Sequence, residues 1–106
     1  MDYRVSWSPE AVEDLEELAA YIEKDSPHYA RAVIDRFLVA SRSLNAHPLR
    51  GRIVPEMNDP AYHESFIHSY RMIYRVEGDE VLVVAVIHGR RLLESLGERL
   101  GGGEMS

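Results

Sequence analysis

The chain contains no cysteine and only one lysine among its 106 residues. The absence of cysteine excludes a disulfide framework, a thiolate metal site and a thiol nucleophile. Long apolar runs are also missing, since the longest, Val81 to Ile87, is far too short to cross a bilayer. The first residues form neither a basic segment nor an apolar one, so we expect no signal peptide and a cytoplasmic location.

Size and composition favour one compact domain. With 45% hydrophobic and 28% charged residues, the chain has enough apolar side chains for a modest core. No internal repeat and no long linker divides it. We therefore expect a single domain over residues 1–100, followed by a flexible, glycine-rich tail at 101–106.

Charge is distributed unevenly along the chain. The formal net charge is −6, and residues 10–25 carry seven acidic side chains against one lysine, which accounts for the whole imbalance. All eleven remaining basic residues are arginines. Arginine is favoured where planar, bidentate contacts to carboxylate or phosphate matter. A GC-rich genome favours arginine codons as well, so the bias alone identifies no ligand.

Two cap signals predict a helical hairpin after a first strand. Residues 3–7 alternate in polarity, as a half-buried strand does. Ser8-Pro9 and Ser26-Pro27 each combine an N-cap hydroxyl with proline at the first helical position. Apolar residues follow at helical spacing, and His47-Pro48 closes the second helix. Because the break between the two predicted helices is very short, they should lie antiparallel.

Three further strands are predicted in the second half of the chain. A short strand at 62–68 precedes two strong ones at 69–76 and 80–88, which a tight turn at Gly78-Asp79 joins into a hairpin. A short amphipathic helix follows at 92–100. The predicted fold class is α+β, with the element order β-α-α-β-β-β(-α) and an antiparallel sheet that carries the helical hairpin on one face.

The hairpin turn predicts a register and therefore two faces. It pairs Val76 with Val81 and, without interruption, Tyr70 with Ile87, which places an apolar face under the helices. The other face should be open, apolar along its middle and cationic toward one end. We expect this face to bind a partner through Arg4, Arg71, Ile73, Arg75, Leu82, Val84, Val86 and His88, with Arg90 and Arg91 just beyond the strand.

The motifs and their order resemble a known family. Ser69 to Val76 reads Ser-Tyr-Arg-Met-Ile-Tyr-Arg-Val, and Val86 to Arg91 reads Val-Ile-His-Gly-Arg-Arg. Further matching pieces are spread along the chain: Ser8-Pro9-Glu10, Ser26-Pro27, His47-Pro48 and Gly51-Arg52. Over residues 3–96 the sequence is similar to the RelE/ParE superfamily of bacterial type II toxins. The resemblance implies a RelE/ParE-like fold and a toxin that a small antitoxin, encoded beside it, neutralises.

Two activities occur in this superfamily. RelE-type members cleave mRNA on the ribosome, whereas ParE-type members inhibit DNA gyrase without nuclease chemistry. Arg71 and either Arg90 or Arg91 match arginines of RelE-type members. However, Tyr62 and Glu64 stand where those members carry lysines, and no tyrosine follows the last strand.

A nuclease would need an acid, a base and positive charge at the scissile phosphate. If the chain is a nuclease, its catalytic residues would be Arg71, His88, Arg91 and Glu56. In the predicted register Arg71 is the diagonal neighbour of His88. Glu56 lies in the segment 53–61, which has no periodicity that would place it.

The same residues also have structural interpretations. Arg71 can form an ion pair on the sheet surface with Glu64 or Glu80. His88 can simply end a strand, and Glu56 can be a solvated loop residue. No residue pattern indicates a metal site or another cofactor.

These observations predict the toxin component of a type II toxin–antitoxin module. We expect it to inhibit growth by poisoning DNA gyrase and to be neutralised by a cognate antitoxin in a hetero-oligomer. The missing lysines and tyrosine favour this activity over the alternative, a RelE-type, ribosome-dependent mRNA endoribonuclease. A third interpretation is a degenerate toxin that only binds its antitoxin. None of the three involves a membrane.

Overall fold

The computed structural model of the chain describes residues 2–88. The expectations for Arg90, Arg91, the terminal helix at 92–100 and the tail at 101–106 lie outside these described residues. No helix within the described range is both long and apolar enough to cross a membrane.

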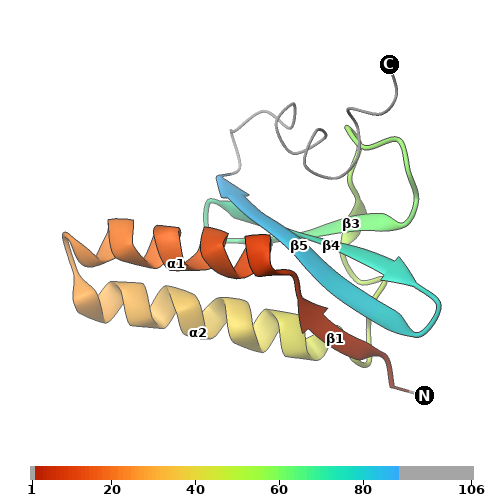
Figure 1. Ribbon diagram of the computed structural model, residues 1–106, viewed down its shortest axis with the longest axis horizontal. Helices are drawn as coiled ribbons and strands as arrows, with labels where there is room; N and C mark the ends of the chain where they lie inside the picture. The colour runs from red at the N-terminus through yellow and green to blue at the C-terminus, as the bar shows by residue number, and fades with distance from the viewer. Residues whose placement is uncertain (1, 89–106) are drawn as a thin grey trace.

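The described residues form two helices and a five-stranded sheet. Their order is β1 (Arg4–Trp7), α1 (Pro9–Glu23), α2 (Pro27–Ser43), β2 (Arg52–Ile53), β3 (Tyr62–Ile67), β4 (Tyr70–Glu77) and β5 (Glu80–His88). The strands lie in the spatial order β1-β5-β4-β3-β2, with the two helices side by side as a hairpin (Figure 1). The α+β class and the helical hairpin are confirmed.

The sheet is mixed and not purely antiparallel. Strand β1 runs parallel to β5, whereas the other neighbouring strands are antiparallel. No tight turn joins β1 to β5, because the rest of the described fold separates them in sequence, so nothing forces them to run in opposite directions. Strand β2, only two residues long, was not among the predicted strands.

Both predicted helix starts are confirmed. The Ser8 hydroxyl accepts a hydrogen bond from the Ala11 N–H at 3.1 Å, and the Ser26 hydroxyl accepts one from the Tyr29 N–H at 3.0 Å. Each cap satisfies one backbone donor that the first helical turn leaves unpaired. Helix α2 ends at Ser43, several residues before the predicted stop.

The main core lies between the helices and one face of the sheet. Phe37 and Val33 of α2 are almost fully buried in the same cluster as Met72, Tyr74 and Val83 of the sheet. Other members of this cluster come from both helices, from the C-cap of α2 and from strands β3 and β5: Ala11, Ile22, Ala30, Leu44, Ile67, Val81 and Val86. The predicted apolar face is therefore largely confirmed, but Val86 was expected on the opposite face, and Ile87, which was expected here, packs on the opposite face.

A β-bulge in the central hairpin explains the position of Val86. Near the turn the register is as predicted, with Val76 opposite Val81. The register shifts between Ile73 and Tyr74, so that Met72 lies opposite Val86 and not opposite Ala85. A bulge inserts one extra residue into a strand, which reverses the side of every residue beyond it. The strand from Val81 to Ile87 is apolar throughout, so its sequence gives no alternation from which this shift could be predicted.

A hydrogen bond joins helix α1 to strand β5 just beyond the bulge. The Asp14 carboxylate accepts a hydrogen bond from the Val86 N–H at 3.0 Å. A bulge disturbs the ladder of backbone hydrogen bonds, and a side-chain acceptor can satisfy a backbone donor there. Asp14 therefore fixes α1 against the half of β5 whose orientation the bulge has changed.

Candidate functional site

The sheet face away from the helices is not the open surface that the sequence predicts. Ile73 is 0% exposed and Val84 is 5% exposed. They belong to a second apolar cluster with Val54, Tyr62 and Ala85, against which Met57, Leu82 and Ile87 also pack. Val54 and Met57 come from the segment after β2, so this segment folds onto the face and buries it. The expectation that Ile73 and Val84 are exposed binding residues is wrong.

Arg71 lies at the end of this face, enclosed by two glutamates. Its side chain is 5% exposed, and its Nε donates a hydrogen bond to Glu64 Oε1 at 2.6 Å. Its two terminal nitrogens donate to the two carboxylate oxygens of Glu56 at 3.3 and 3.1 Å. Glu64 is also buried, and it forms a second ion pair with Arg52. The four side chains, here called the Arg71 cluster, therefore balance two positive charges with two negative ones.

This geometry decides between the earlier interpretations of these residues. The ion pair of Arg71 with Glu64 is confirmed, whereas Glu80 pairs with Arg4 instead. Glu56 does lie in a loop and its side chain is 47% exposed, but its carboxylate also accepts hydrogen bonds from both terminal nitrogens of Arg71. The sequence alone did not predict which residue pairs with Glu56, because the segment 53–61 has no regular periodicity.

The ion pairs fix the protonation states within the Arg71 cluster. Burial opposes the positive charge of Arg71, but hydrogen bonds to Glu56 and Glu64 outweigh this effect and raise its pKa. The hydrogen bonds from Arg71 lower the pKa of Glu56 below its ordinary value. At neutral pH Glu56 is therefore a carboxylate already engaged by a cation, which makes it a poor proton donor.

Phe66 covers the outer side of the Arg71 cluster. Its ring centroid lies 5.4 Å from the guanidinium carbon of Arg52 and 6.0 Å from that of Arg71. Both distances allow cation–π attraction, and Phe66 is 55% exposed. Sequence reasoning did not identify Phe66, although the alternation of β3 places its side chain on the same face as Glu64.

The other described arginines of the predicted face are also paired. Arg4 contacts Glu80 at 2.7 Å and Asp79 at 3.3 Å. Because Arg4 lies opposite Glu80 beside the hairpin turn, it is at the far end of the sheet from the Arg71 cluster. Arg75 forms an ion pair with Glu77 at 2.7 Å. Among the described residues, the predicted cationic end of this face is therefore replaced by separate ion pairs.

His88 is not brought together with Arg71. In the observed register Arg71 lies opposite Ile87, and His88 lies opposite Tyr70. The His88 ring contacts the Tyr70 ring edge-on, with 5.5 Å between centroids, and Tyr70 packs against the core beneath the helices. The bulge has thus moved His88 to the helix side of the sheet. Among residues 2–88 there is also no cluster of three side chains suited to hold a metal ion.

Comparison with known proteins gives the chain a family. The sequence model of the family described as "ParE toxin of type II toxin-antitoxin system, parDE" matches residues 5–93. The protein named Putative toxin Y4kP, from Sinorhizobium fredii, is 41% identical over 49 residues, which are 46% of this chain and 51% of that protein. The chain thus matches about half the length of this curated relative.

Solved structures share the fold. A chain of the chromosomal ParDE system from P. aeruginosa superimposes with a TM-score of 0.67 at 17% identity, covering 81% of this chain and 95% of that one. A chain of the archaeal RelE–RelB complex from Pyrococcus horikoshii gives 0.62 at 19% identity, over 87% and 100%. These likenesses concern the fold alone. Because the family match covers most of the sequence and extends over every described element but the first residue of β1, the chain belongs to the ParE toxin family of type II toxin–antitoxin systems.

Proposed function

We propose that this toxin inhibits growth by binding and poisoning DNA gyrase, without cutting RNA, and that a cognate antitoxin neutralises it. The observation that carries this proposal is the enclosure of Arg71. The one described arginine that resembles a nuclease residue is buried between Glu64 and Glu56 and has its charge balanced there.

The Arg71 cluster is poorly suited to RNA cleavage. Stabilising a phosphorane requires a cation that can approach it, and Arg71 already donates to two carboxylates. A phosphate entering this site would meet the negative charge of Glu56 and the buried Glu64. General acid–base catalysis also requires groups within hydrogen-bond reach of the substrate, and His88 lies on the helix side of the sheet. These features support a toxin that acts through contacts with a protein.

The charge of the chain supports the same conclusion. Binding to RNA depends on neutralising phosphates with basic side chains. The chain has a formal net charge of −6, and its first helix lies within the most acidic segment. An inhibitor that binds a protein target does not need a broad basic surface.

Two assays on the purified toxin, freed from its antitoxin, test the proposal. In the first, gyrase acts on plasmid with ATP, and we expect loss of supercoiling or trapped cleaved DNA. In the second, programmed ribosomes carry an mRNA, which should stay intact. Cleavage of the mRNA in the ribosomal A site would contradict the proposal and establish the endoribonuclease instead. Inactivity in both assays would leave the degenerate toxin that only binds its antitoxin.

Two variants connect the assays to the residues. Glu56→Gln and His88→Ala change groups that only a nuclease would use for proton transfer. If the toxin poisons gyrase, both variants should inhibit supercoiling at the same concentration as the unchanged protein, provided that circular dichroism shows them folded. A loss of growth inhibition in either folded variant, together with intact inhibition of gyrase, would point to a second activity.

A further inference from the structure

The helical hairpin projects beyond the sheet and ends in the short break between α1 and α2 (Figure 1). Two large aromatic side chains flank this break. Tyr21, in the last turn of α1, is 68% exposed, and Tyr29, in the first turn of α2, is 47% exposed. Tyr21 is the most exposed large apolar residue in the described part of the chain.

The turn between β3 and β4 brings a third ring to this end of the hairpin. His68 of that turn is exposed, and its ring meets the Tyr29 ring edge-on, with 6.1 Å between centroids. Its φ of +57° lies in the left-handed region, which few residues other than glycine adopt. The turn therefore has an unfavourable backbone conformation at the residue that contacts Tyr29.

Tyr70 of β4 connects the exposed tyrosines to the core. Its ring packs against Phe37 of the main core, with 6.4 Å between centroids. Burial raises the pKa of Tyr70, and the neighbouring hydroxyl groups of Tyr29 and Tyr21 raise it further, so the three hydroxyl groups lie near one another. Tyr21, Tyr29 and His68 therefore form one continuous surface, here called the hairpin-tip surface.

The exposed charges around Tyr21 are mainly acidic. Glu17 lies one turn before Tyr21 on α1, and Asp25 lies in the break between the helices. Both are exposed, and neither forms an ion pair within the described residues. Glu23 adds a third exposed acidic group there, and Lys24 offsets one of the three. The hairpin-tip surface is therefore an aromatic patch with an acidic rim.

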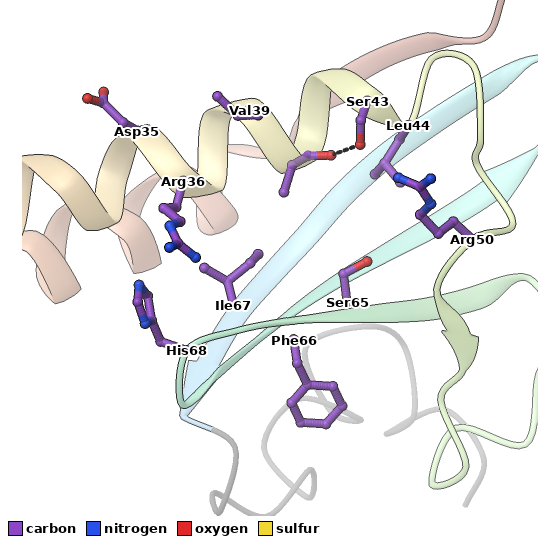
Figure 2. A pocket seen from close by; sticks show the side chains of 11 residues that line it. Asp35, Arg36, Val39, Ser43, Leu44, Arg50, Ser65, Phe66, Ile67 and His68 are labelled. Carbon is purple, nitrogen blue, oxygen red and sulfur yellow. Dashed lines mark hydrogen bonds between the residues drawn. The ribbon is translucent and has the colours of Figure 1, made fainter.

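A groove beside the hairpin-tip surface has the opposite charge. It has a volume of about 620 Å³, lies between α2 and β3, and has Arg36 near His68 at one end and Arg50 toward the other (Figure 2). Asp35 is the one acidic side chain among its lining residues. A basic partner is therefore repelled at the groove and attracted at the hairpin-tip surface.

We propose that the toxin binds its target through the hairpin-tip surface, which contacts a basic surface of DNA gyrase. This inference rests on the proposed function, which names gyrase. Gyrase acts on DNA, so it carries basic surfaces that attract phosphates. Glu17 and Asp25 pair with basic side chains there, while Tyr21 and Tyr29 are buried against the target. Tyrosine is enriched among the residues that contribute most to protein interfaces, since it buries a large area at a small entropic cost.

A second copy of the chain fits this surface poorly. Two copies related by a twofold axis would bring the same acidic rims together, and like charges oppose association. Self-association through the hairpin tip is therefore an outcome of the test and not the expectation.

Removal of the two tyrosine rings tests the surface directly. Tyr21→Ala combined with Tyr29→Ala should weaken binding to immobilised gyrase about tenfold or more, and should raise the inhibitory concentration in the supercoiling assay by a similar factor. Val39→Ala combined with Leu49→Ala is the matched control, because these apolar side chains are 58% and 64% exposed but lie further along the chain from the tip. Equal gyrase affinities for the two double variants would overturn the proposal.

Binding to the antitoxin encoded beside this chain is the second measurement, because it reports both on folding and on the choice of partner. The tyrosine variant should bind the antitoxin as tightly as the unchanged toxin does, as measured by calorimetry. Loss of antitoxin binding with retained gyrase binding would assign the surface to the antitoxin and overturn the proposal. A dimer of the free toxin that the tyrosine changes dissociate would overturn it as well. If the double variant does not fold, Tyr21→Ala alone provides the same comparison at the more exposed position.

The acidic rim needs its own variant. Glu17→Gln combined with Asp25→Asn should weaken gyrase binding and reduce the loss of affinity caused by added salt, since two attractive charges are removed. Glu10→Gln combined with Asp35→Asn changes the net charge by the same amount at exposed positions away from the tip, and should keep the salt dependence of the unchanged toxin. The same salt dependence in both double variants would contradict the pairing of the rim with a basic target surface.

The proposed activity and the hairpin-tip surface can fail separately. If the unchanged toxin inhibits gyrase and the tyrosine variant inhibits it equally well, the surface is wrong and the activity stands. If the unchanged toxin neither binds nor inhibits gyrase, the proposed function is wrong, and the inference that rests on it is wrong as well.

Discussion

Arg71 shows how a residue that resembles a catalytic group can instead have a structural role. Burying an arginine is costly unless hydrogen-bonded carboxylates accompany it. Glu64 supplies one such partner from the neighbouring strand, and Glu56 supplies the other from the segment that covers the face. The pairing with Glu64 was accessible from sequence, since the two residues lie on adjacent predicted strands. The contact with Glu56 was not, because it depends on how a segment without periodicity folds in three dimensions.

Arg71→Ala should lower the free energy of unfolding by about 3 kcal/mol or more, because Glu64 would keep a buried charge that Arg52 alone balances. Urea denaturation measures the change. Arg75→Ala is the control, since it breaks a more exposed pair with Glu77 and should cost less than about 1 kcal/mol. The double change of Arg71→Met with Glu64→Leu removes both buried charges and should cost less than Arg71→Ala. An Arg71→Ala variant as stable as Arg75→Ala would show that the cluster contributes little.

Glu56 should make stability depend on pH in the acid range. Its pKa in the folded protein lies below the ordinary value of 4.5 because Arg71 donates to it. A lowered folded-state pKa stabilises the protein above about pH 4.5, and this contribution is lost as the pH falls through the lowered value. We therefore expect the free energy of unfolding, measured by denaturation at several pH values, to fall less steeply from neutral pH to about pH 3 for Glu56→Gln than for the unchanged protein. The same pH dependence of stability in both proteins would contradict the lowered pKa of Glu56.

At the scale of secondary-structure elements, the sequence predicts where the helices begin better than it predicts the register between strands. The two Ser-Pro caps gave both helix starts, because a cap depends on residues that are adjacent in the chain. The register of β4 and β5 was correct near the turn and wrong beyond Ile73. The bulge that separates these regions is associated with a contact between Asp14 and Val86, which are 72 residues apart. Such a contact leaves no local sequence signal.

Asp14 should therefore stabilise the bulged hairpin from a distance in sequence. Asp14→Ala leaves the Val86 N–H without this acceptor and should lower stability by about 1 kcal/mol. Asp14→Asn keeps a side-chain oxygen and should retain most of the stability. Hydrogen exchange at Val86 provides the residue-specific measurement, with faster exchange expected in the alanine variant. Unchanged exchange in Asp14→Ala would show that the hydrogen bond does not protect this amide.

At the scale of the whole molecule, net charge and local charge have different effects. The acidic excess is concentrated on and beside α1, whereas the groove between α2 and β3 is lined by Arg36 and Arg50, which form no ion pair within residues 2–88. The composition of the chain shows the first feature but not the second, because only the fold places Arg36 and Arg50 along the same groove. For this reason the acidic character of the first helix could be predicted from the sequence, whereas the groove could not.

The acidic segment should make the free toxin more stable in salt. Like charges on neighbouring turns of α1 repel one another, and added ions screen this repulsion. The melting temperature should rise as sodium chloride increases from low ionic strength to about 0.5 M. Glu16→Lys with Glu17→Lys, two exposed positions on α1, should reduce this dependence. A melting temperature that falls with salt would show that ion pairs outweigh the repulsion.

Gly51 has a consequence for the genetics of this toxin. A side-chain carbon there would collide with the Glu64 carbonyl and lie 2.6 Å from the Tyr74 hydroxyl, which already accepts a hydrogen bond from the Gly51 N–H. Around Gly78 there is open space, although its φ of +61° restricts what can replace it. If the protein inhibits growth as proposed, selection for bacteria that survive its expression should recover many different replacements of Gly51, whereas Gly78→Asn should still inhibit growth.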